Sequence, residues 1–300
     1  MMKKRSILKN LGFFILGILT CFVIDLIWDW EENRESYNRG YQAASELWEQ
    51  NPDARAVSGK ASEWQDLLRN NSLEGWHIFQ DDGSKKGWMV EDGILIFNGI
   101  SDMETGEGDA SLLSDQVYES FEIKFDWKIV AGGNSGFMWA VQEEEKYNYP
   151  YQTGPEIQIL DPAIYSRPEM ALGGEIEINN AREDLEAHKH FVGALYDLRA
   201  PDRIDVAKAA GEWNSYHIII DYRANRGEVV LNKVLINSFP LQGPEWEAML
   251  RESKFSRSEE SPYLGDARWY DYGKFSRGHL CFQDHPGQVS FKNIRIRELD

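Results

Sequence analysis

The chain has 300 residues and a formal net charge of −18, a length that accommodates one large β domain or two ordinary ones. Nucleic-acid binding requires a basic stripe along the phosphates, and Lys and Arg cluster only at the N-terminus, so no nucleic-acid partner is expected. A neutral, sugar-like ligand is easier to accommodate. Eleven Trp, 13 Tyr and 14 Phe suit strands, sugar-stacking surfaces, or both.

Residues 1–28 are predicted to be a signal sequence or a membrane anchor. A basic flank, KKR at 3–5, precedes the apolar run "LGFFILGILTCFVI", and no small-x-small cleavage site follows. Cys21 lies in this run, so a lipoprotein is a further alternative. The domain is then expected outside the cytoplasm, periplasmic or tethered to the membrane. Cys281 is the only other cysteine, which excludes a disulfide within the folded domain and a thiolate metal site.

Residues 29–61 are polar and predict a spacer, and residues 62–300 predict an all-β domain. Short apolar alternations separated by Gly, Asn and Asp, without a long amphipathic helix, indicate a two-sheet sandwich or jelly roll. Asp92-Gly93 predicts a tight hairpin turn, and 243–255 predicts one surface helix. The predicted strands lie within 87–99, 121–130, 136–141, 155–160, 215–222, 227–236, 278–283 and 288–299.

The segment "FEIKFDWKIV", residues 121–130, alternates apolar and charged side chains without interruption. Successive side chains of a strand point to opposite faces, so this pattern predicts a strand that covers a core on one side only.

The segment "AGGNSG", residues 131–136, predicts a loop. Gly132, Gly133 and Gly136 permit backbone angles closed to other residues and leave room for a ligand. Asn134 and Ser135 offer short-range donors and acceptors. Both a structural turn and a ligand-binding loop fit this segment.

Two segments place polar side chains in pairs on one face of a strand. In "PEIQIL" Glu156 and Gln158 share a face, and in "CFQDHPG" Gln283 and His285 point together while Asp284 points away. Either pair alone fits a solvated face. Two such pairs, each with a Gln, favour a concave polar patch.

Four more side chains suit stacking on a sugar ring or hydrogen bonding to it. They are His190 and Tyr196 of "HFVGALYDL", and Trp213 and Asn214 of "AGEWN".

Carboxylate spacing keeps a conventional sandwich glycosidase open as an alternative. Glu156 and Asp161 provide two acids at such a spacing, and retaining enzymes hold theirs roughly 5–5.5 Å apart. A second copy at Glu175 and Glu177 has Asn180 at the third position and lacks an acid there. Nucleophile-elbow, zincin and phosphate-loop motifs are absent. Carboxylates could bind Ca²⁺, but no loop has a calcium spacing, so no metal is predicted.

Eight motifs in order give the chain a resemblance to a known family. They are "EWQDLLRNNSLEGWHIF", "GGNSGFMW", "TGPEIQILD", "GALYDLRAP", "AGEWN", "LNKVLI", "SKF" and "GHLCFQDHPGQVSFKNIRIREL". From about Ser62 to Asp300 the chain resembles the 3-keto-disaccharide hydrolase domain family, also described as 3-keto-glucoside lyase and 3-keto-2-hydroxy-glucal hydratase. The resemblance implies a concanavalin A-like jelly roll in an exported protein that acts on sugars oxidised at C3.

The family's polar motif positions fall on seven residues: Asn134, Glu156, Gln158, Asp161, Gln283, Asp284 and His285. Side-chain chemistry and same-face geometry suggest that Glu156 and His285 transfer protons, and which of the two is the base is left open. Asn134, Gln158 and Gln283 would bind hydroxyls or a developing enolate, and the two aspartates bind substrate or brace loops. A carbohydrate-binding module without catalysis is the alternative from another class.

The chain departs from the family in two places. Lys233 in "LNKVLI" replaces the glycine of a frequent Asn-Gly turn, at a cost of about 1 kcal/mol if it adopts the left-handed conformation. The stretch 162–190 is long and acidic, so the rim of the site and its substrate preference are expected to differ.

Overall fold

The computed structural model describes residues 61–81, 87–99, 110–165, 187–256 and 269–300. The predictions for the signal or anchor, for Cys21, for the spacer and for the Glu175 motif lie outside these residues, and the predicted domain boundaries stay predictions. Within the described ranges, no helix combines the length and apolar character needed to cross a membrane.

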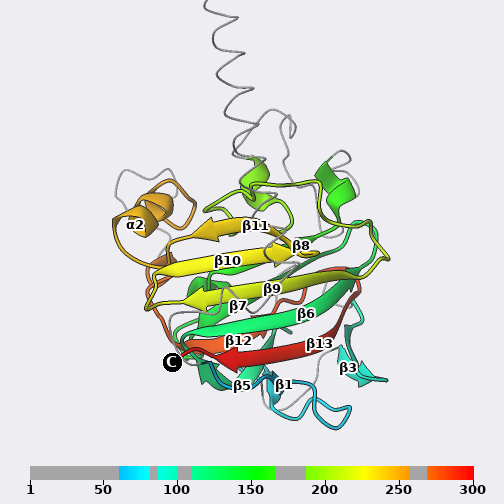
Figure 1. Cartoon of the computed structure of the whole chain (residues 1–300). Coiled ribbons are helices and arrows are strands. Elements are labelled where there is room, and N and C mark those ends of the chain that lie inside the picture. Colours follow the sequence, from blue (N-terminus) through cyan, green and yellow to red (C-terminus); the bar gives the residue numbers. More distant parts are fainter. Residues whose placement is uncertain (1–60, 82–86, 100–109, 166–186, 257–268) are drawn as a thin grey trace, which may run out of the picture. The chain divides into compact units, whose positions relative to one another are not determined.

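The strands form two antiparallel sheets, which confirms the predicted two-sheet sandwich of jelly-roll type. Figure 1 shows the larger sheet in front of the smaller one. The eight-stranded sheet runs β11 (Val234–Phe239), β10 (Arg226–Leu231), β9 (Asn214–Asp221), β6 (Phe121–Ile129), β13 (Val289–Glu298), β4 (Ile94–Phe97), β3 (Trp88–Glu91), with β1 (Gln65–Asp66) also paired to β13. The five-stranded sheet runs β2 (Trp76–Ile78), β5 (Leu112–Tyr118), β12 (Gly278–Phe282), β7 (Asn134–Val141), β8 (Glu156–Leu160).

The remaining elements of the described ranges are short helices. The predicted surface helix is α2 (Pro244–Arg251), which begins with Pro at its first position and buries Trp246 and Leu250, one turn apart on the same face. Three 3₁₀ turns, η1 (Pro150–Gln152), η2 (Pro162–Tyr165) and η4 (Ala187–His190), lie on connections between strands.

The core between the sheets is built largely from aromatic rings. The ring centroids of Phe125 and Phe282 lie 5.3 Å apart, and those of Phe125 and Phe137 lie 5.6 Å apart, so side chains of the two sheets interdigitate. The inward face of β6 is the predicted one: Phe121, Ile123, Phe125, Trp127 and Ile129 are all at most 2% exposed.

The opposite face of β6 is less open than the alternation predicts. Glu122 is 2% exposed, and its carboxylate accepts hydrogen bonds from Arg297 at 2.9 Å and pairs with His217 at 2.8 Å. Trp64, just before β1, covers this group, with the Arg297 guanidinium 4.8 Å from its ring centroid. Trp64 thus covers part of a face that the alternation within β6 alone predicts to be solvated.

The edge of the five-stranded sheet at β8 is covered by the segment 193–196. Gly193 N–H donates to the Gln158 carbonyl at 2.9 Å, and Gln158 N–H donates to the Ala194 carbonyl at 3.0 Å. Tyr196 N–H donates to the Glu156 carbonyl at 2.9 Å. These bonds satisfy an edge that would otherwise be open, and they fix Tyr196 beside Glu156.

The β10–β11 hairpin contains the strained lysine expected from the sequence. Asn232 has φ 49° and Lys233 has φ 72°, the paired left-handed conformation of a type I′ turn. We expect Lys233→Gly to raise the free energy of unfolding by about 1 kcal/mol, because glycine adopts this conformation without a Cβ penalty. Urea unfolding of the full chain measures the change. Lys233→Ala keeps the Cβ and is the control; a gain of the same size in that variant would contradict the explanation.

Candidate active site

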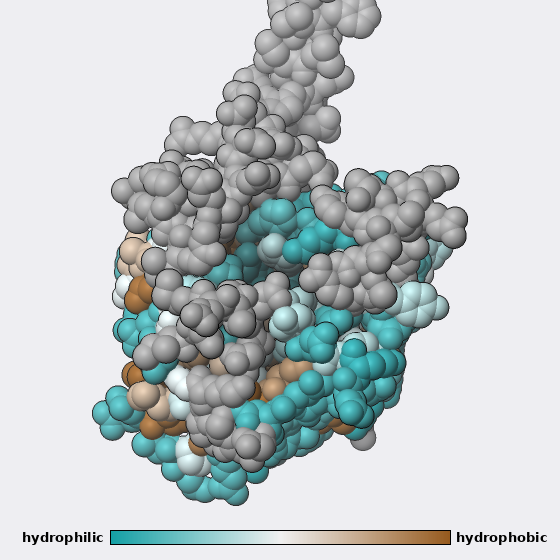
Figure 2. Space-filling view, turned by 180° about the vertical axis from the view of Figure 1, so that it is seen from behind, coloured by the Kyte–Doolittle hydropathy of each residue, from teal (hydrophilic) through white to brown (hydrophobic). Residues whose placement is uncertain are grey.

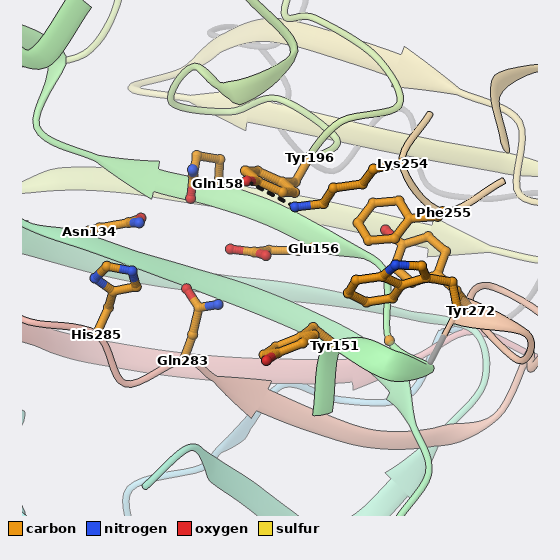
Figure 3. A pocket seen from close by; sticks show the side chains of 12 residues that line it. Asn134, Tyr151, Glu156, Gln158, Tyr196, Lys254, Phe255, Tyr272, Gln283 and His285 are labelled. Atoms are coloured by element: carbon orange, nitrogen blue, oxygen red, sulfur yellow. Dashed lines mark hydrogen bonds between the residues drawn. The ribbon is translucent and has the colours of Figure 1, made fainter. Parts of the chain in front are cut away.

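A pocket of about 250 Å³ opens on the side of the five-stranded sheet that faces away from the core (Figure 3). Figure 2 shows the side of the molecule that lies behind in Figure 1, where hydrophilic residues line the visible part of a hollow in the surface. The pocket is lined by Asn134, Tyr151, Gly154, Glu156, Gln158, Tyr196, Lys254, Phe255, Trp269, Tyr272, Gln283 and His285.

Strand β8 supplies Glu156 and Gln158 to the pocket. Ile157 and Ile159 alternate with them and belong to the core between the sheets, as the sequence predicts. The two polar side chains do not lie on a solvated face, because Glu156 is 6% exposed and Gln158 is 2% exposed. Segments far away in the sequence cover them and turn the sheet face into a pocket.

Strand β7 begins earlier than the predicted loop allows. Asn134 is its first residue, so the turn is confined to residues 130–133, closed by a hydrogen bond from Gly133 N–H to the Val130 carbonyl at 3.0 Å, with φ 73° at Gly132. Asn134 lines the pocket, and its Oδ1 is buried without a hydrogen-bond partner among the described residues. Gln158 Oε1 is also buried without a hydrogen-bond partner among the described residues. Two buried amide groups are therefore available to a ligand.

The glycine turn holds the Asp161 carboxylate. Gly132 N–H donates to Asp161 Oδ2 at 2.8 Å, and Ala163 N–H donates to Oδ1 at 3.0 Å. Asp161 is 1% exposed and lies outside the lining of the pocket. Its position is that of a brace between the end of β8 and the turn before β7.

The chain after β12 brings Gln283 and His285 to the pocket, and Asp284 points away from it, as the alternation predicts. Asp284 is 1% exposed and accepts a hydrogen bond from Ser111 Oγ at 2.7 Å. The two polar pairs recognised in the sequence therefore line one pocket.

Burial has the largest effect on the pKa of the Glu156 carboxyl group. Loss of solvation raises the pKa of its carboxyl group to about 7, and the nearby Lys254 ammonium opposes this shift. No described residue donates a hydrogen bond to the carboxylate. Burial also lowers the pKa of His285, which keeps its imidazole neutral near pH 7. A carboxyl group that titrates near neutrality in a pocket is suited to accepting a proton from a substrate.

Lys254 is the charged group that the sequence reasoning missed. Its Nζ donates to Tyr196 Oη at 3.2 Å and lies 4.3 Å from the centroid of that ring (Figure 3). Asp197 holds the lysine in place from behind, since its Oδ2 accepts from Lys254 N–H at 2.6 Å and its Oδ1 pairs with His190 Nε2 at 2.8 Å. The "SKF" motif contains Lys254, but nothing in that tripeptide indicates a neighbouring carboxylate.

Four aromatic residues of the lining were also missed: Tyr151, Phe255, Trp269 and Tyr272. They come from η1, from the chain after α2 and from the segment before β12. The abundance of aromatic residues is the only sequence signal for them, and it does not distinguish core from pocket.

The other sequence candidates lie outside the lining. His190 supports Tyr196, with ring centroids 4.8 Å apart, and pairs with Asp197. Trp213 directly precedes β9 of the eight-stranded sheet, and the Lys292 ammonium lies 4.0 Å from the centroid of its ring. Asn214 accepts a hydrogen bond from Lys208 N–H at 2.8 Å. Among the residues that the structure describes, no three His, Cys, Asp or Glu side chains gather as a metal site would require.

Gly136 is needed for the position of the Glu156 carboxylate. The two residues lie on neighbouring strands, and a Cβ at position 136 would lie 2.6 Å from Glu156 Cδ. We expect Gly136→Ala to displace the carboxylate and to lower kcat/KM about 10²-fold on the substrate proposed below. Gly93→Ala is the control for the loss of a glycine: at φ 75° it adds backbone strain, but its Cβ meets nothing within 4 Å and does not touch the carboxylate. Wild-type turnover by folded Gly136→Ala would refute this role.

The fold and the pocket define a class of protein: a jelly-roll sandwich with a ligand pocket. The pocket holds a buried carboxylate among amide groups, an ammonium group and aromatic rings, and these groups are suited to binding a small polar ring. The model of the 3-keto-alpha-glucoside-1,2-lyase-like domain family matches residues 63–297, and the chain belongs to this family.

Individual relatives agree with this membership. The chain is 28% identical over 276 residues to a protein of Bacteroides thetaiotaomicron named 3-keto-disaccharide hydrolase, a match that covers 88% of this chain and 86% of the relative. A crystal structure from Parabacteroides distasonis, described as a candidate glycosyl hydrolase, is 32% identical with a TM-score of 0.62 and covers 79% of this chain and 94% of its own. A second structure from that organism, 21% identical with a TM-score of 0.53, shares the fold.

Proposed function

We propose that this protein cleaves glycosides whose sugar carries a ketone at C3, by elimination followed by hydration. Family membership and the name of the Bacteroides relative support an enzyme of glycoside hydrolysis. The observation that carries the mechanism is the buried Glu156 carboxyl group, whose pKa is raised to about 7 between amide groups and Lys254.

The chemistry follows from the ketone. A carbonyl at C3 acidifies the C2–H bond, so a base removes that proton and the electron pair forms the C1=C2 bond. The C1–O bond breaks, and its electrons leave with the departing oxygen, which takes up a proton. Water then adds to C1 and a proton returns to C2, so the net reaction is hydrolysis.

Glu156 is the proposed base for the C2 proton. Its carboxylate has no hydrogen-bond donor among the described residues, and burial makes it more basic than an exposed glutamate. The protonated form is equally stable near neutrality, so the same group can return the proton to C2 in the hydration step.

The amide side chains and the histidine are the proposed partners of the sugar. Asn134, Gln158 and Gln283 present hydrogen-bonding groups on the same side of the pocket as His285 (Figure 3). A neutral imidazole can donate a hydrogen bond to the C3 oxygen as negative charge develops there. Such donors act mainly on the transition state, where that charge is largest.

Lys254 and Tyr196 are the proposed source of the proton for the departing oxygen. Tyr196 Oη accepts a hydrogen bond from Lys254 Nζ, which leaves the tyrosine proton free to point into the pocket. Burial raises the pKa of Tyr196 and keeps it protonated. The ammonium stabilises the charge that forms on the phenol oxygen when the proton leaves.

The positions of the acidic residues speak against a two-carboxylate glycosidase built on Glu156 and Asp161. Both Asp161 oxygens accept backbone hydrogen bonds, and the residue lies outside the lining of the pocket. A glycosidase of that kind needs both carboxyl groups at the scissile bond.

Cleavage in D₂O tests the mechanism. Elimination and hydration place deuterium at C2 of the released 3-keto sugar, whereas direct displacement at C1 leaves the C2 hydrogen in place. Nuclear magnetic resonance of the product after a short reaction measures this, with the free 3-keto sugar incubated in the same buffer to correct for spontaneous exchange. Cleavage without excess deuterium at C2 and without a transient enone absorbance would contradict the proposal.

A further inference from the structure

The pocket has two chemically different ends, with Glu156 between them (Figure 3). One end carries amide and imidazole groups, from Asn134, Gln158, Gln283 and His285. The other carries aromatic rings, from Tyr151, Phe255, Trp269 and Tyr272. A ligand that spans the pocket therefore meets hydrogen-bonding groups on one side of the carboxylate and flat apolar surfaces on the other.

The aromatic end is held by contacts among its own rings. Phe255 stacks on Tyr272 with centroids 3.7 Å apart and meets Trp269 edge-on at 5.0 Å. Tyr151 lies 5.9 Å from Trp269 and stacks on Tyr149 at 5.0 Å. Phe255 and Tyr272 are buried, while the other three rings are half-buried and extend this surface toward solvent.

We propose that the aromatic end binds the departing group of the substrate, and that aryl glycosides are the preferred class. This inference rests on the proposed function, which places the oxidised sugar at the amide end. The scissile C1–O bond then lies near Glu156, and the group beyond the oxygen extends along the rings.

The chemistry of the two ends favours an aryl group over a sugar in this place. A second sugar can also stack on such rings, but each of its buried hydroxyls needs a hydrogen-bond partner, and the side chains of the aromatic end have at most one polar group each. A planar aromatic group makes offset-stacked or edge-to-face contacts with such rings. Lys254 and Tyr196 lie at the boundary of the two ends, where the departing oxygen would be.

Binding to the full chain carrying Glu156→Gln tests this assignment without turnover. Calorimetry measures Kd for the phenyl, methyl and glucosyl 3-keto-glucosides, each as both anomers. We expect the phenyl compound to bind about tenfold more tightly than the methyl compound, and more tightly than the glucosyl compound. Adding Trp269→Ala or Tyr151→Ala in the same background should bring the phenyl-to-methyl ratio to within about threefold.

Tyr270→Ala in the same background is the matched control, because Tyr270 is 66% exposed and lies outside the pocket lining. It should keep the full ratio. Equal Kd values for phenyl and methyl, tighter binding of the glucosyl compound, no binding of the phenyl compound, or an unchanged ratio in both pocket variants would overturn the assignment. Failure of the proposed function is seen separately, as wild-type protein that binds these compounds and cleaves none.

Discussion

Replacement of Glu156 by Gln is expected to lower kcat for a 3-keto-glycoside by about 10²–10⁴-fold, the usual contribution of a positioned general base. Glutamine fills nearly the same volume against Gly136 but cannot accept the C2 proton. In the wild-type protein kcat/KM should rise with pH up to about 7, because the pKa of Glu156 is raised to about 7 and only the ionised form acts as a base. Steady-state rates between pH 5 and 9 measure both effects.

Two companion variants sharpen this experiment. Glu145→Gln removes an exposed carboxylate and should leave the rate and its pH profile as they are. His285→Ala should also lower kcat, by removing a donor to the developing enolate. Full activity in either variant would refute the role proposed for the residue it replaces.

The same carboxyl group should make stability depend on pH by about 3 kcal/mol. The pKa of Glu156 is raised from 4.5 to about 7 on folding, and each unit corresponds to about 1.4 kcal/mol. As pH rises from 4.5 to 7, the unfolded chain releases a proton that the folded protein retains, so this contribution to stability is lost progressively and stays lost above pH 7. The loss is absent in Glu156→Gln.

Urea unfolding of the wild-type protein and of Glu156→Gln at several pH values measures this effect. The variant should gain about 3 kcal/mol in free energy of unfolding relative to wild type between pH 4 and pH 8. In Glu145→Gln the difference from wild type should stay constant. A constant difference for Glu156→Gln as well would show that the carboxyl group is solvated in the folded protein.

Local alternation was sufficient to predict much of the fold and four of the twelve residues that line the pocket. The period of two in β6 identified the core face, and the same period in β8 and after β12 selected the side chains that share the pocket. Both inferences depend only on the geometry of a single strand. The same period of two also placed Asp284 on the opposite side of the chain from Gln283 and His285.

Features that depend on contacts between distant segments were not predictable in this way. Lys254 reaches the pocket because Asp197 accepts its backbone N–H, and Glu122 is buried because Trp64 covers it. Neither partner is near in sequence. The predicted glycine loop is longer than the observed turn, because Asn134 and Gly136 already pair with β8. A local sequence pattern does not reveal the register between these two strands.

The most direct measurement compares a 3-keto-disaccharide with its unoxidised parent, incubated separately with the protein while released sugar and ultraviolet absorbance are followed. We expect cleavage of the keto sugar alone, with a transient absorbance from the enone that elimination forms. Cleavage of the parent would contradict the mechanism in favour of a conventional glycosidase. Binding of the keto sugar without its cleavage would contradict it in favour of a carbohydrate-binding module.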